Sequence, residues 1–368
     1  MELILFIIIT LYFIEHAVLF TGLLKNLDRS SLTFNNPHDF PSVSIIVAAK
    51  NEEFNIGSCI NSLLKLVYPD DKLEIIVIND NSADKTKEII QSYNRGDRRI
   101  KYLETKGRIG PLKGKANALA QAIKESKGEI IFTTDADSEV KPTWVKETIK
   151  YFDEKTGVVC GYSLMKPKNL FWGIQSFDWL YLLTLCSGAD GINKQLSCVG
   201  NNMSYRRKTY EEVGGYENIE FSVTEDFKLL HTIKDKTNWG MKFPVNSETL
   251  NDTVPCLTYK ELYQQKKRWG IGGLDIGIPG YFVGLMGWLT GAMILFSWFF
   301  VGIEVYLFLL ILKLMIDFLF TFPVIKKFNF YGILKYFISF EIYFALYSLL
   351  LPFILILSRR VVWKEQKL

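Results

Sequence analysis

Apolar residues are concentrated at the two ends of the chain, and a polar region with short apolar runs lies between them. Residues 3–24, 281–322 and 337–357 are apolar runs long enough for one, two and one membrane-spanning helices. Glu15 and His16 lie near the middle of the first run, where polar groups are costly in lipid, so they are expected to face other helices or to mark a tilt. The pattern predicts three parts, namely an N-terminal membrane helix, a soluble domain and a C-terminal region of about three membrane helices (1–24, 25–276 and 277–368).

The central region alternates between short apolar runs and helical stretches, which is typical of an α/β fold. Residues 43–49, 73–78 and 128–134 predict buried strands, and residues 158–162 predict a further one. Acidic or amide side chains follow each of the first three strands. These side chains are also common in turns, but ligands of open parallel sheets bind beyond the carboxyl ends of the strands. Three such strand ends favour a ligand site.

Residues 170–189 are apolar and aromatic, but Gln175 and Asp178 interrupt the run. The segment is more polar than a typical membrane span. We interpret it as an interfacial amphipathic helix, with a second interfacial helix near residues 258–276. A helix buried in the core is the alternative interpretation of residues 170–189.

The chain carries 43 basic and 39 acidic residues, a formal net charge of +4. This excess is too small to indicate a nucleic-acid partner, and the five cysteines show no paired or metal-ligating spacing. Lys25 and Arg29 follow the first apolar run, which favours a soluble domain on the cytoplasmic side. The membrane is expected to be the cell membrane, which is the inner membrane if the protein is bacterial. Three C-terminal spans then put the C-terminus outside, whereas Arg359, Arg360 and Lys364 favour the inside. The C-terminal topology therefore stays open.

Asp135-Ala136-Asp137 directly follows the third predicted strand. In an extended chain the side chains of residues i and i+2 point the same way. Two carboxylates together with substrate phosphates are ligands that Mg²⁺ or Mn²⁺ commonly uses. The motif alone is a weak signal, but its place after a buried strand, with other acidic strand ends, predicts a divalent metal site at Asp135 and Asp137.

Asp80 follows the second predicted strand, where its carboxylate can accept a hydrogen bond from the imide N–H of a uracil. Its alternative role is that of a helix-cap or turn residue, which fits Asp84 better. Lys115 lies in a small basic loop that opens a helix, and such a loop can hold phosphate or sugar hydroxyls. Surface lysines are common, so Lys115 is a weaker candidate.

Thr224-Glu225-Asp226 precedes a predicted helix, a place where acidic residues also have a structural explanation. The functional interpretation makes Asp226 the general base for an acceptor hydroxyl. In the segment 265–269, Arg268 can contact a departing diphosphate in a bidentate manner and Trp269 can stack on a sugar. The alternative is an interfacial anchor, because Lys, Arg and Trp favour membrane edges.

The order of these elements resembles the membrane-embedded branch of the family 2 glycosyltransferases, which have the GT-A fold. That branch includes ceramide glucosyltransferase and the cellulose, chitin and hyaluronan synthases. Its pattern is an aspartate after the second strand, then Asp-x-Asp, Thr-Glu-Asp and Gln-x-x-Arg-Trp. This chain supplies the pattern in that order over about residues 43–269, with Asp80, Asp135, Asp137, Glu225, Asp226, Gln265, Arg268 and Trp269. It departs from the pattern at Asn79, where many members have a second aspartate.

The resemblance implies an α/β fold of GT-A type (a Rossmann-like nucleotide-diphospho-sugar transferase domain) with transmembrane helices. It implies inverting sugar transfer from a nucleotide sugar, most often a UDP-sugar, to a lipid-linked or glycan acceptor, with Mg²⁺ or Mn²⁺ as cofactor. The residues expected to act in catalysis are Asp226, Glu225, Arg268, Trp269 and Gln265. The expected nucleotide-sugar pocket consists of Ala48, Asn51, Glu52, Asp80, Lys115 and Asp135, and the metal ligands are Asp137 and Asp135.

Three other classes of protein fit the pattern less well. A processive polysaccharide synthase shares the Gln-x-x-Arg-Trp motif, but about four spans leave few helices for a polymer channel. A non-catalytic membrane scaffold is disfavoured because every acidic motif is present. A transporter needs more membrane sequence than polar sequence, and this chain has the reverse. The donor sugar, the acceptor and the linkage are not defined by the sequence.

Overall fold

The computed structural model describes residues 1–27, 32–33, 39–357, 362–363 and 366–367. The chain forms two compact units. We call them the sheet unit, which contains residues 30–164, 197–254 and 360–368, and the helical unit, which contains residues 1–29, 165–196 and 255–359. Arg29, Arg359, Arg360 and Lys364, which bear on the predicted topology, lie outside the described residues.

The sheet unit is built on a seven-stranded sheet in the order β3-β2-β1-β4-β8-β6-β9. The first four strands are parallel, β8 is antiparallel to both β4 and β6, and β9 is parallel to β6. A three-stranded sheet has the order β5-β10-β7. The strands are β1 (Val43–Ala49), β2 (Leu73–Asn79), β3 (Ile100–Glu104), β4 (Ile130–Asp135), β5 (Glu139–Val140), β6 (Thr156–Cys160), β7 (Ser163–Met165), β8 (Met203–Arg206), β9 (Gly240–Lys242) and β10 (Asn251–Thr253).

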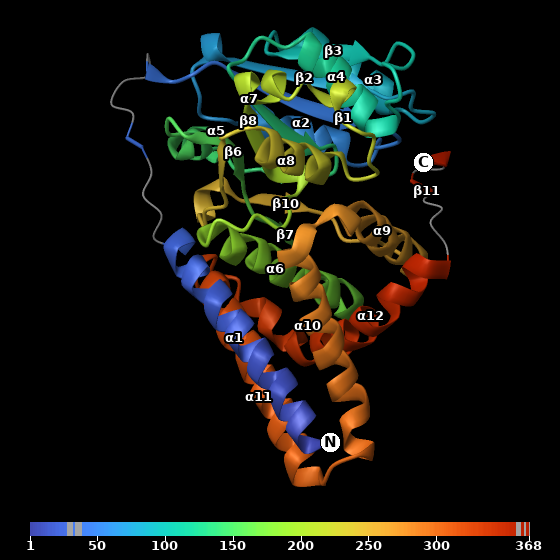
Figure 1. The fold of residues 1–368 in the computed structure, drawn as a ribbon. Coiled ribbons are helices and arrows are strands. Elements are labelled where there is room, and N and C mark those ends of the chain that lie inside the picture. The colour runs from blue at the N-terminus through green and yellow to red at the C-terminus, as the bar shows by residue number, and fades with distance from the viewer. Residues whose placement is uncertain (28–31, 34–38, 358–361, 364–365, 368) are drawn as a thin grey trace. The chain divides into compact units, whose positions relative to one another are not determined.

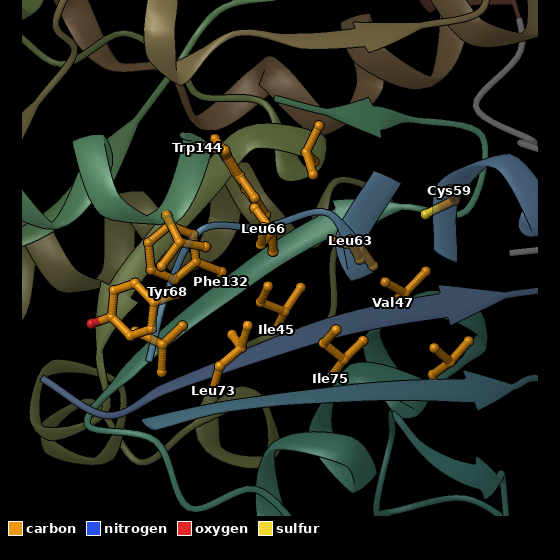
Figure 2. Close-up of a cluster of buried hydrophobic side chains, with 14 of the residues drawn as sticks. Ile45, Val47, Cys59, Leu63, Leu66, Tyr68, Leu73, Ile75, Phe132 and Trp144 are labelled. Carbon is orange, nitrogen blue, oxygen red and sulfur yellow. The ribbon is translucent and has the colours of Figure 1, made fainter. Parts of the chain in front are cut away.

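Helices cover this sheet, which explains why its central strands are nearly continuous runs of Val and Ile. The helices of the unit are α2 (Ile56–Leu64), α3 (Thr86–Gly96), α4 (Gly114–Lys124), α5 (Trp144–Thr148), α7 (Arg207–Glu212) and α8 (Glu225–Lys236). Figure 2 shows side chains of β1, β2 and β4 meeting Leu63 and Cys59 of α2, with Phe132 and Trp144 in the same cluster. The Phe132 and Trp144 rings lie edge to face with centroids 5.0 Å apart.

The chain runs from β1 to β2 and β3 on one side, and then crosses back to β4 on the other side of β1. This reversal is the position at which open α/β sheets bind ligands. Ala48 pairs with Ile78 of β2 and with Asp135 of β4, so the ends of the three predicted strands lie next to one another. The predicted parallel strands and their common edge are confirmed.

The helical unit contains four helices long and apolar enough to cross a membrane among the described residues, at Glu2–Leu27, Gly277–Phe299, Ile303–Lys327 and Tyr331–Leu357. They correspond to α1 (Glu2–Leu27), α10 (Gly277–Phe296), α11 (Ile303–Lys327) and α12 (Phe337–Leu357), and the unit also contains α6 (Leu170–Gly191) and α9 (Tyr259–Gly272) (Figure 1). The two C-terminal apolar blocks of the sequence thus contain three helices, as expected.

Helix α6 packs closely against α1 through glycines. A side chain at Gly22 of α1 would bring its Cβ to 2.0 Å from the carbonyl oxygen of Gly188 in α6, so no larger residue fits there. Asn26 of α1 also donates from Nδ2 to the backbone oxygen of Ser187, at 2.6 Å. Close backbone approach through small residues is typical of helix pairs in membranes. Sixteen of the 22 residues of α6 are buried, which matches the buried-helix interpretation of this segment and not an amphipathic helix with one exposed face.

Polar side chains of α1, α6, α11 and α12 form a buried cluster, which we call the membrane polar cluster (Tyr12, His16, Tyr181, Lys313, Asp317 and Glu341). The Tyr12 hydroxyl donates to Asp317 Oδ1 at 2.7 Å. Lys313 Nζ lies 2.8 Å from Asp317 Oδ2 and also pairs with Glu341. His16 therefore faces other helices, one of the two roles expected from the sequence, and Lys313 is paired with both Asp317 and Glu341, as expected for charges in a membrane segment.

Replacing Lys313 with methionine is expected to destabilise the helical unit strongly. Loss of the ammonium leaves the Asp317 and Glu341 carboxyls without their shared cation, and removing one partner of a buried ion pair costs about 3–5 kcal/mol. The melting temperature of the detergent-solubilised protein measures this effect. Lys326→Met, at an exposed position near the end of the same helix, is the matched control. Equal melting temperatures of the Lys313→Met variant and the wild type would contradict the expected role of the pair.

Candidate active site

The loops after β1 and β2 hold each other in place at the carboxyl edge of the sheet. Asn51 and Asn81 both adopt positive φ angles, of 51° and 52°, which asparagine tolerates better than most residues. The Asn51 backbone N–H donates to Ser82 Oγ at 3.0 Å, and Asn51 Oδ1 accepts from the backbone N–H of Ala83 at 2.9 Å. Glu52 joins the same contact, since its backbone N–H donates to Thr86 Oγ1 at 2.8 Å. The edge of the sheet that these hydrogen bonds hold in place includes three residues predicted for the nucleotide pocket, Ala48, Asn51 and Glu52.

Asp80 is a buried carboxylate with one unused oxygen. Its backbone N–H donates to the Ala49 carbonyl at 2.8 Å, and its side chain is only 6% exposed. Oδ1 accepts from Thr105 Oγ1 at 3.1 Å, whereas Oδ2 is buried with no hydrogen-bond partner in the described part of the chain. A buried acceptor without a donor costs about 1–3 kcal/mol. An external N–H at this edge of the sheet would remove that cost.

Two neighbours of Asp80 accept backbone hydrogen bonds in the turn, and one of them is Asp84, which the sequence favoured for this role. Asp84 Oδ1 accepts from the backbone N–H of Thr86 at 3.0 Å, and its Oδ2 accepts from the backbone N–H of Glu53 at 3.0 Å. Asn79 Oδ1 accepts from the backbone N–H of Ser82 at 3.3 Å. Asn79, the departure from the family pattern, therefore supports the turn that carries Asp80.

Asp135 and Asp137 lie at the end of β4. Asp135 is the last residue of the strand, and its carbonyl accepts from the backbone N–H of Ser138 at 3.0 Å, so the chain turns at Ala136 and Asp137. Cys59 Sγ of α2 also lies 3.5 Å from the Asp135 carbonyl. Burial, followed by the charges of Asp137 and Asp135, raises the pKa of the Cys59 thiol, which makes it a packing group rather than a thiolate ligand.

Lys115 joins two of the acidic motifs. Its ammonium lies 2.6 Å from Asp135 Oδ1 and 3.0 Å from Glu225 Oε1. Burial alone would lower the pKa of this ammonium, but the negative charges of Asp135, Glu225 and Asp226 outweigh the burial and raise the pKa above its ordinary value. Lys115 is therefore a permanent cation at the centre of the acidic cluster. A weaker candidate of the sequence thus has a central position.

Glu225 and Asp226 form the first turn of α8, and Gly200 lies beside them. A Cβ on Gly200 would come within 3.1 Å of Asp226 Oδ2 and 3.2 Å of Lys115 Nζ. Gly200 is fixed to β4, because Thr133 Oγ1 donates to its carbonyl oxygen at 2.9 Å. The missing side chain lets the carboxylate of Asp226 approach Lys115, and hence Asp135. Neither Thr133 nor Thr105 was singled out from the sequence, because a lone threonine in or after a strand carries no distinctive pattern.

The described residues contain no group of three or more His, Cys, Asp or Glu side chains that could hold a metal on their own. Asp135 and Asp137 supply two carboxylates at one strand end. That donor set fits Mg²⁺ or Mn²⁺, which commonly take one or two carboxylates and complete their coordination with substrate phosphates and water. The donor set does not distinguish these two ions.

Gln265, Arg268 and Trp269 lie on α9 of the helical unit, and Arg268 and Trp269 are partly exposed. The Trp269 ring packs against Trp179 of α6, with ring centroids 5.0 Å apart. Thr258 caps the helix by accepting from the Glu261 backbone N–H at 3.2 Å. The sheet unit therefore joins Asp135, Lys115 and Glu225 directly, and Asp80 lies at the same edge of the sheet. The roles of the α9 residues rest on the sequence motif.

Comparison with protein families identifies the chain. The model described as Glycosyl transferase family 2 matches residues 44–214, and the one described as Glycosyl transferase family group 2 matches residues 130–357, more than half of the chain. The chain belongs to the family 2 glycosyltransferases. The resemblance predicted from the ordered motifs is thus confirmed.

Three of the curated relatives of this chain carry different names. The probable glycosyltransferase YdaM of Bacillus subtilis is 28% identical over 286 residues, covering 72% of this chain and 66% of the relative. The beta-monoglucosyldiacylglycerol synthase of Trichormus variabilis is 31% identical over 242 residues, covering 63% and 49%. The poly-beta-1,6-N-acetyl-D-glucosamine synthase of Staphylococcus epidermidis is 26% identical over 260 residues, covering 68% and 59%. The chain thus spans about half to two thirds of the length of these relatives.

Among solved structures, the mannosyltransferase PcManGT from Pyrobaculum calidifontis, in complex with GDP-Man and Mn²⁺, aligns with a TM-score of 0.63 at 17% sequence identity. The alignment covers 95% of this chain and 98% of that one. The family 2 glycosyltransferase described here therefore has the GT-A fold predicted from its sequence. With four apolar helices of spanning length in its described residues, it is a membrane protein.

Proposed function

We propose that this protein transfers a sugar, with inversion, from a nucleoside-diphosphate sugar to a lipid-linked or glycan acceptor at the membrane. The observation that carries the proposal is the position of Lys115, bonded to Asp135 and Glu225 and adjacent to Asp226. Lys115 brings together two acidic motifs, Asp-x-Asp and Thr-Glu-Asp, whose proposed chemistry differs. A purely structural ion pair would need only one of these carboxylates.

The donor is proposed to be a UDP-sugar held at the carboxyl edge of the sheet. Asp80 supports this assignment, because its buried Oδ2 needs an N–H donor and the imide of uracil supplies one. The charge of Lys115 suits a diphosphate. Asp135 and Asp137 would hold a divalent cation, which when bound neutralises charge on the diphosphate. The GDP-Man in the structurally similar mannosyltransferase shows that other nucleotides bind to this fold.

In the proposed reaction Asp226 accepts the proton of the acceptor hydroxyl. The acceptor oxygen forms a bond to the anomeric carbon on the face opposite the diphosphate, while the bond from that carbon to the diphosphate oxygen breaks. The nucleoside diphosphate leaves with the bonding electron pair, so the reaction inverts the anomeric centre. Lys115 stays charged throughout, and catalysis is largely positioning and electrostatic stabilisation.

For α9 we propose that Arg268 contacts the departing diphosphate, that Trp269 stacks on a sugar and that Gln265 assists them. This part rests on the Gln-x-x-Arg-Trp motif. We further propose that the sheet unit is cytoplasmic. Lys25 in the last turn of α1 supports that orientation, since basic residues favour the cytoplasmic end of a membrane span.

A lipid acceptor and a single addition are our preferred form of the reaction. The relative with the highest identity quoted above carries the name of a glucosyldiacylglycerol synthase. Repeated addition to a growing polysaccharide is the second candidate, supported by the relative named as a poly-N-acetylglucosamine synthase. The two differ in the product, which is a glycolipid in the first case and a long polymer in the second.

Membranes containing the protein, supplied in turn with UDP-glucose, UDP-N-acetylglucosamine, UDP-galactose and GDP-mannose, test the proposal by mass spectrometry of lipid and polymer products. We expect a UDP-sugar to be used and a glycolipid to form. Asp80→Ala should raise the KM for that donor about 10- to 100-fold, since hydrogen bonds to charged groups contribute about 1.5–3 kcal/mol.

Asp71→Ala, at an exposed position just before β2, is the matched control and should leave KM unchanged. Exclusive use of GDP-mannose, or an unchanged KM in the Asp80→Ala variant, would contradict uracil recognition by Asp80. Long polymer would favour the processive candidate. No sugar transfer from any of the four donors would contradict the proposed function.

A further inference from the structure

One face of α6 contacts the α9 segment at four positions. Phe171, Gln175, Asp178 and Trp179 have the relative spacing 0, 4, 7 and 8, which lies on one side of an α-helix. The Phe171 ring lies 4.5 Å from that of Tyr259 at the start of α9. Gln175 contacts the residues before α9, Asp178 contacts its middle, and Trp179 contacts its last turn.

Gln175 holds the backbone segment that leads into α9. Its side-chain amide makes two hydrogen bonds with the backbone of Cys256: Oε1 accepts from the N–H at 2.9 Å, and Nε2 donates to the carbonyl at 3.1 Å. Such a pair defines both the position and the direction of the backbone it binds. The polar residue that interrupts the apolar run of α6 is thus a partner of the segment that leads into the Gln-x-x-Arg-Trp motif.

Asp178 and Lys266 form a buried ion pair between α6 and α9. Asp178 is 2% exposed and Lys266 is 4% exposed, and the ammonium bonds to Asp178 Oδ2. Taking both charges out of water is costly, and an apolar pair of similar volume is often at least as stable. Folding stability alone is therefore a weak explanation for the pair.

Lys266 also contacts two aromatic rings, one of which is the motif tryptophan. Its Nζ lies 4.6 Å from the centroid of the Trp269 ring and 4.9 Å from that of Tyr347 in α12. The Trp179 ring lies beside Trp269 at 5.0 Å, with 32° between the ring planes. An ammonium within about 6 Å of an aromatic face is attracted to it. The Asp178–Lys266 pair thus restrains the orientation of Trp269 from one side, and Trp179 packs against the same ring.

We propose that Lys266 and Asp178 are positioning residues for sugar transfer, acting through Trp269. This inference rests on the proposed function, in which Trp269 stacks on a sugar. Asp178 anchors the ammonium, and the ammonium holds the indole in its working orientation. Lys266 occupies an unspecified position of the Gln-x-x-Arg-Trp motif and thereby gains a specific role in this chain.

A double-mutant cycle on the transfer rate tests the proposal. Lys266→Met should lower kcat at least tenfold in the wild-type protein but less than twofold in a Trp269→Ala background, because its effect passes through the indole. The KM for the nucleotide sugar should change less than twofold. Lys260→Met, at an exposed position of the same helix, should behave like the wild type. Effects of Lys266→Met and Trp269→Ala that simply multiply would overturn the proposal.

The variant Asp178→Leu with Lys266→Met separates positioning from stability. An apolar pair should restore a melting temperature close to that of the wild type, while kcat stays at least tenfold low. Wild-type kcat in this stable double variant would show that the charges serve folding alone and would overturn the proposal.

Failure of the proposed function would appear differently, as absence of transfer by the wild-type protein. Amide hydrogen exchange then tests the positioning pair without any reaction. Asp178→Asn should speed exchange of the α9 amides at least tenfold relative to those of α11, and unchanged exchange in α9 would overturn the role of the pair.

Discussion

Replacing Asp226 with asparagine is expected to lower the rate of sugar transfer by about 10²- to 10⁴-fold, the usual contribution of a positioned general base. Asparagine has nearly the same shape but accepts no proton from the acceptor hydroxyl. Nucleotide binding should change little, because Asp80 and the Asp-x-Asp motif are untouched. Initial rates of transfer and UDP affinity by titration calorimetry provide the two measurements.

Asp235→Asn supplies the matched control, since Asp235 is an exposed aspartate on the same helix. It should transfer at the wild-type rate. Full activity of the Asp226→Asn variant would refute the base assignment. Loss of UDP affinity together with activity would instead show that Asp226 supports the structure around Lys115.

Replacing Asp137 with asparagine is the second change with a large expected effect. Removing one of the two proposed carboxylate ligands should raise the Mn²⁺ or Mg²⁺ concentration needed for half-maximal activity at least tenfold, since these ions are commonly held by one or two carboxylates. Chelation with EDTA should abolish transfer by the wild-type protein, and added metal should restore it. Activity titrated against each metal gives the measurement.

Glu139→Gln is the control for this experiment, because Glu139 is exposed and lies two residues after Asp137 in the chain. Its metal dependence should match that of the wild type. If EDTA-treated protein retains full activity, the metal assignment for Asp135 and Asp137 is wrong. An Asp137→Asn variant with unchanged metal dependence would place the ion on other groups.

The parts of the fold that the sequence predicted are those with a strong local pattern. β1 and β2 are rich in Val and Ile, and β4 begins with Ile-Ile-Phe; the structure begins and ends these strands within two residues of the expected positions. The strands β5, β7 and β10 contain two or three residues each, too few for any periodicity. Their positions depend on pairing with chain-distant partners, such as Asn251 with Val140.

In the candidate site, too, the sequence predicted features with a local pattern and missed those that depend on distant contacts. The order of acidic motifs predicted which carboxylates gather at the edge of the sheet. The sequence did not reveal that Lys115 joins Asp135 and Glu225, because nothing local marks a lysine as the partner of a carboxylate 110 positions away. In α6, the polar Asp178 suggested an exposed face, and its partner Lys266 lies 88 positions further along the chain. Long-range ion pairs are thus invisible to local hydrophobic patterns.

The membrane polar cluster changes the meaning of the N-terminal helix. A helix that only tethers a protein to a bilayer can be exchanged for any apolar segment of equal length. Here Tyr12 and His16 of α1 provide hydrogen-bonding groups to Tyr181 and Asp317. A foreign anchor would keep the chain in the membrane but take these partners away. The first 27 residues are accordingly an integral piece of the helical unit, and its assembly must wait for the last helices to be synthesised.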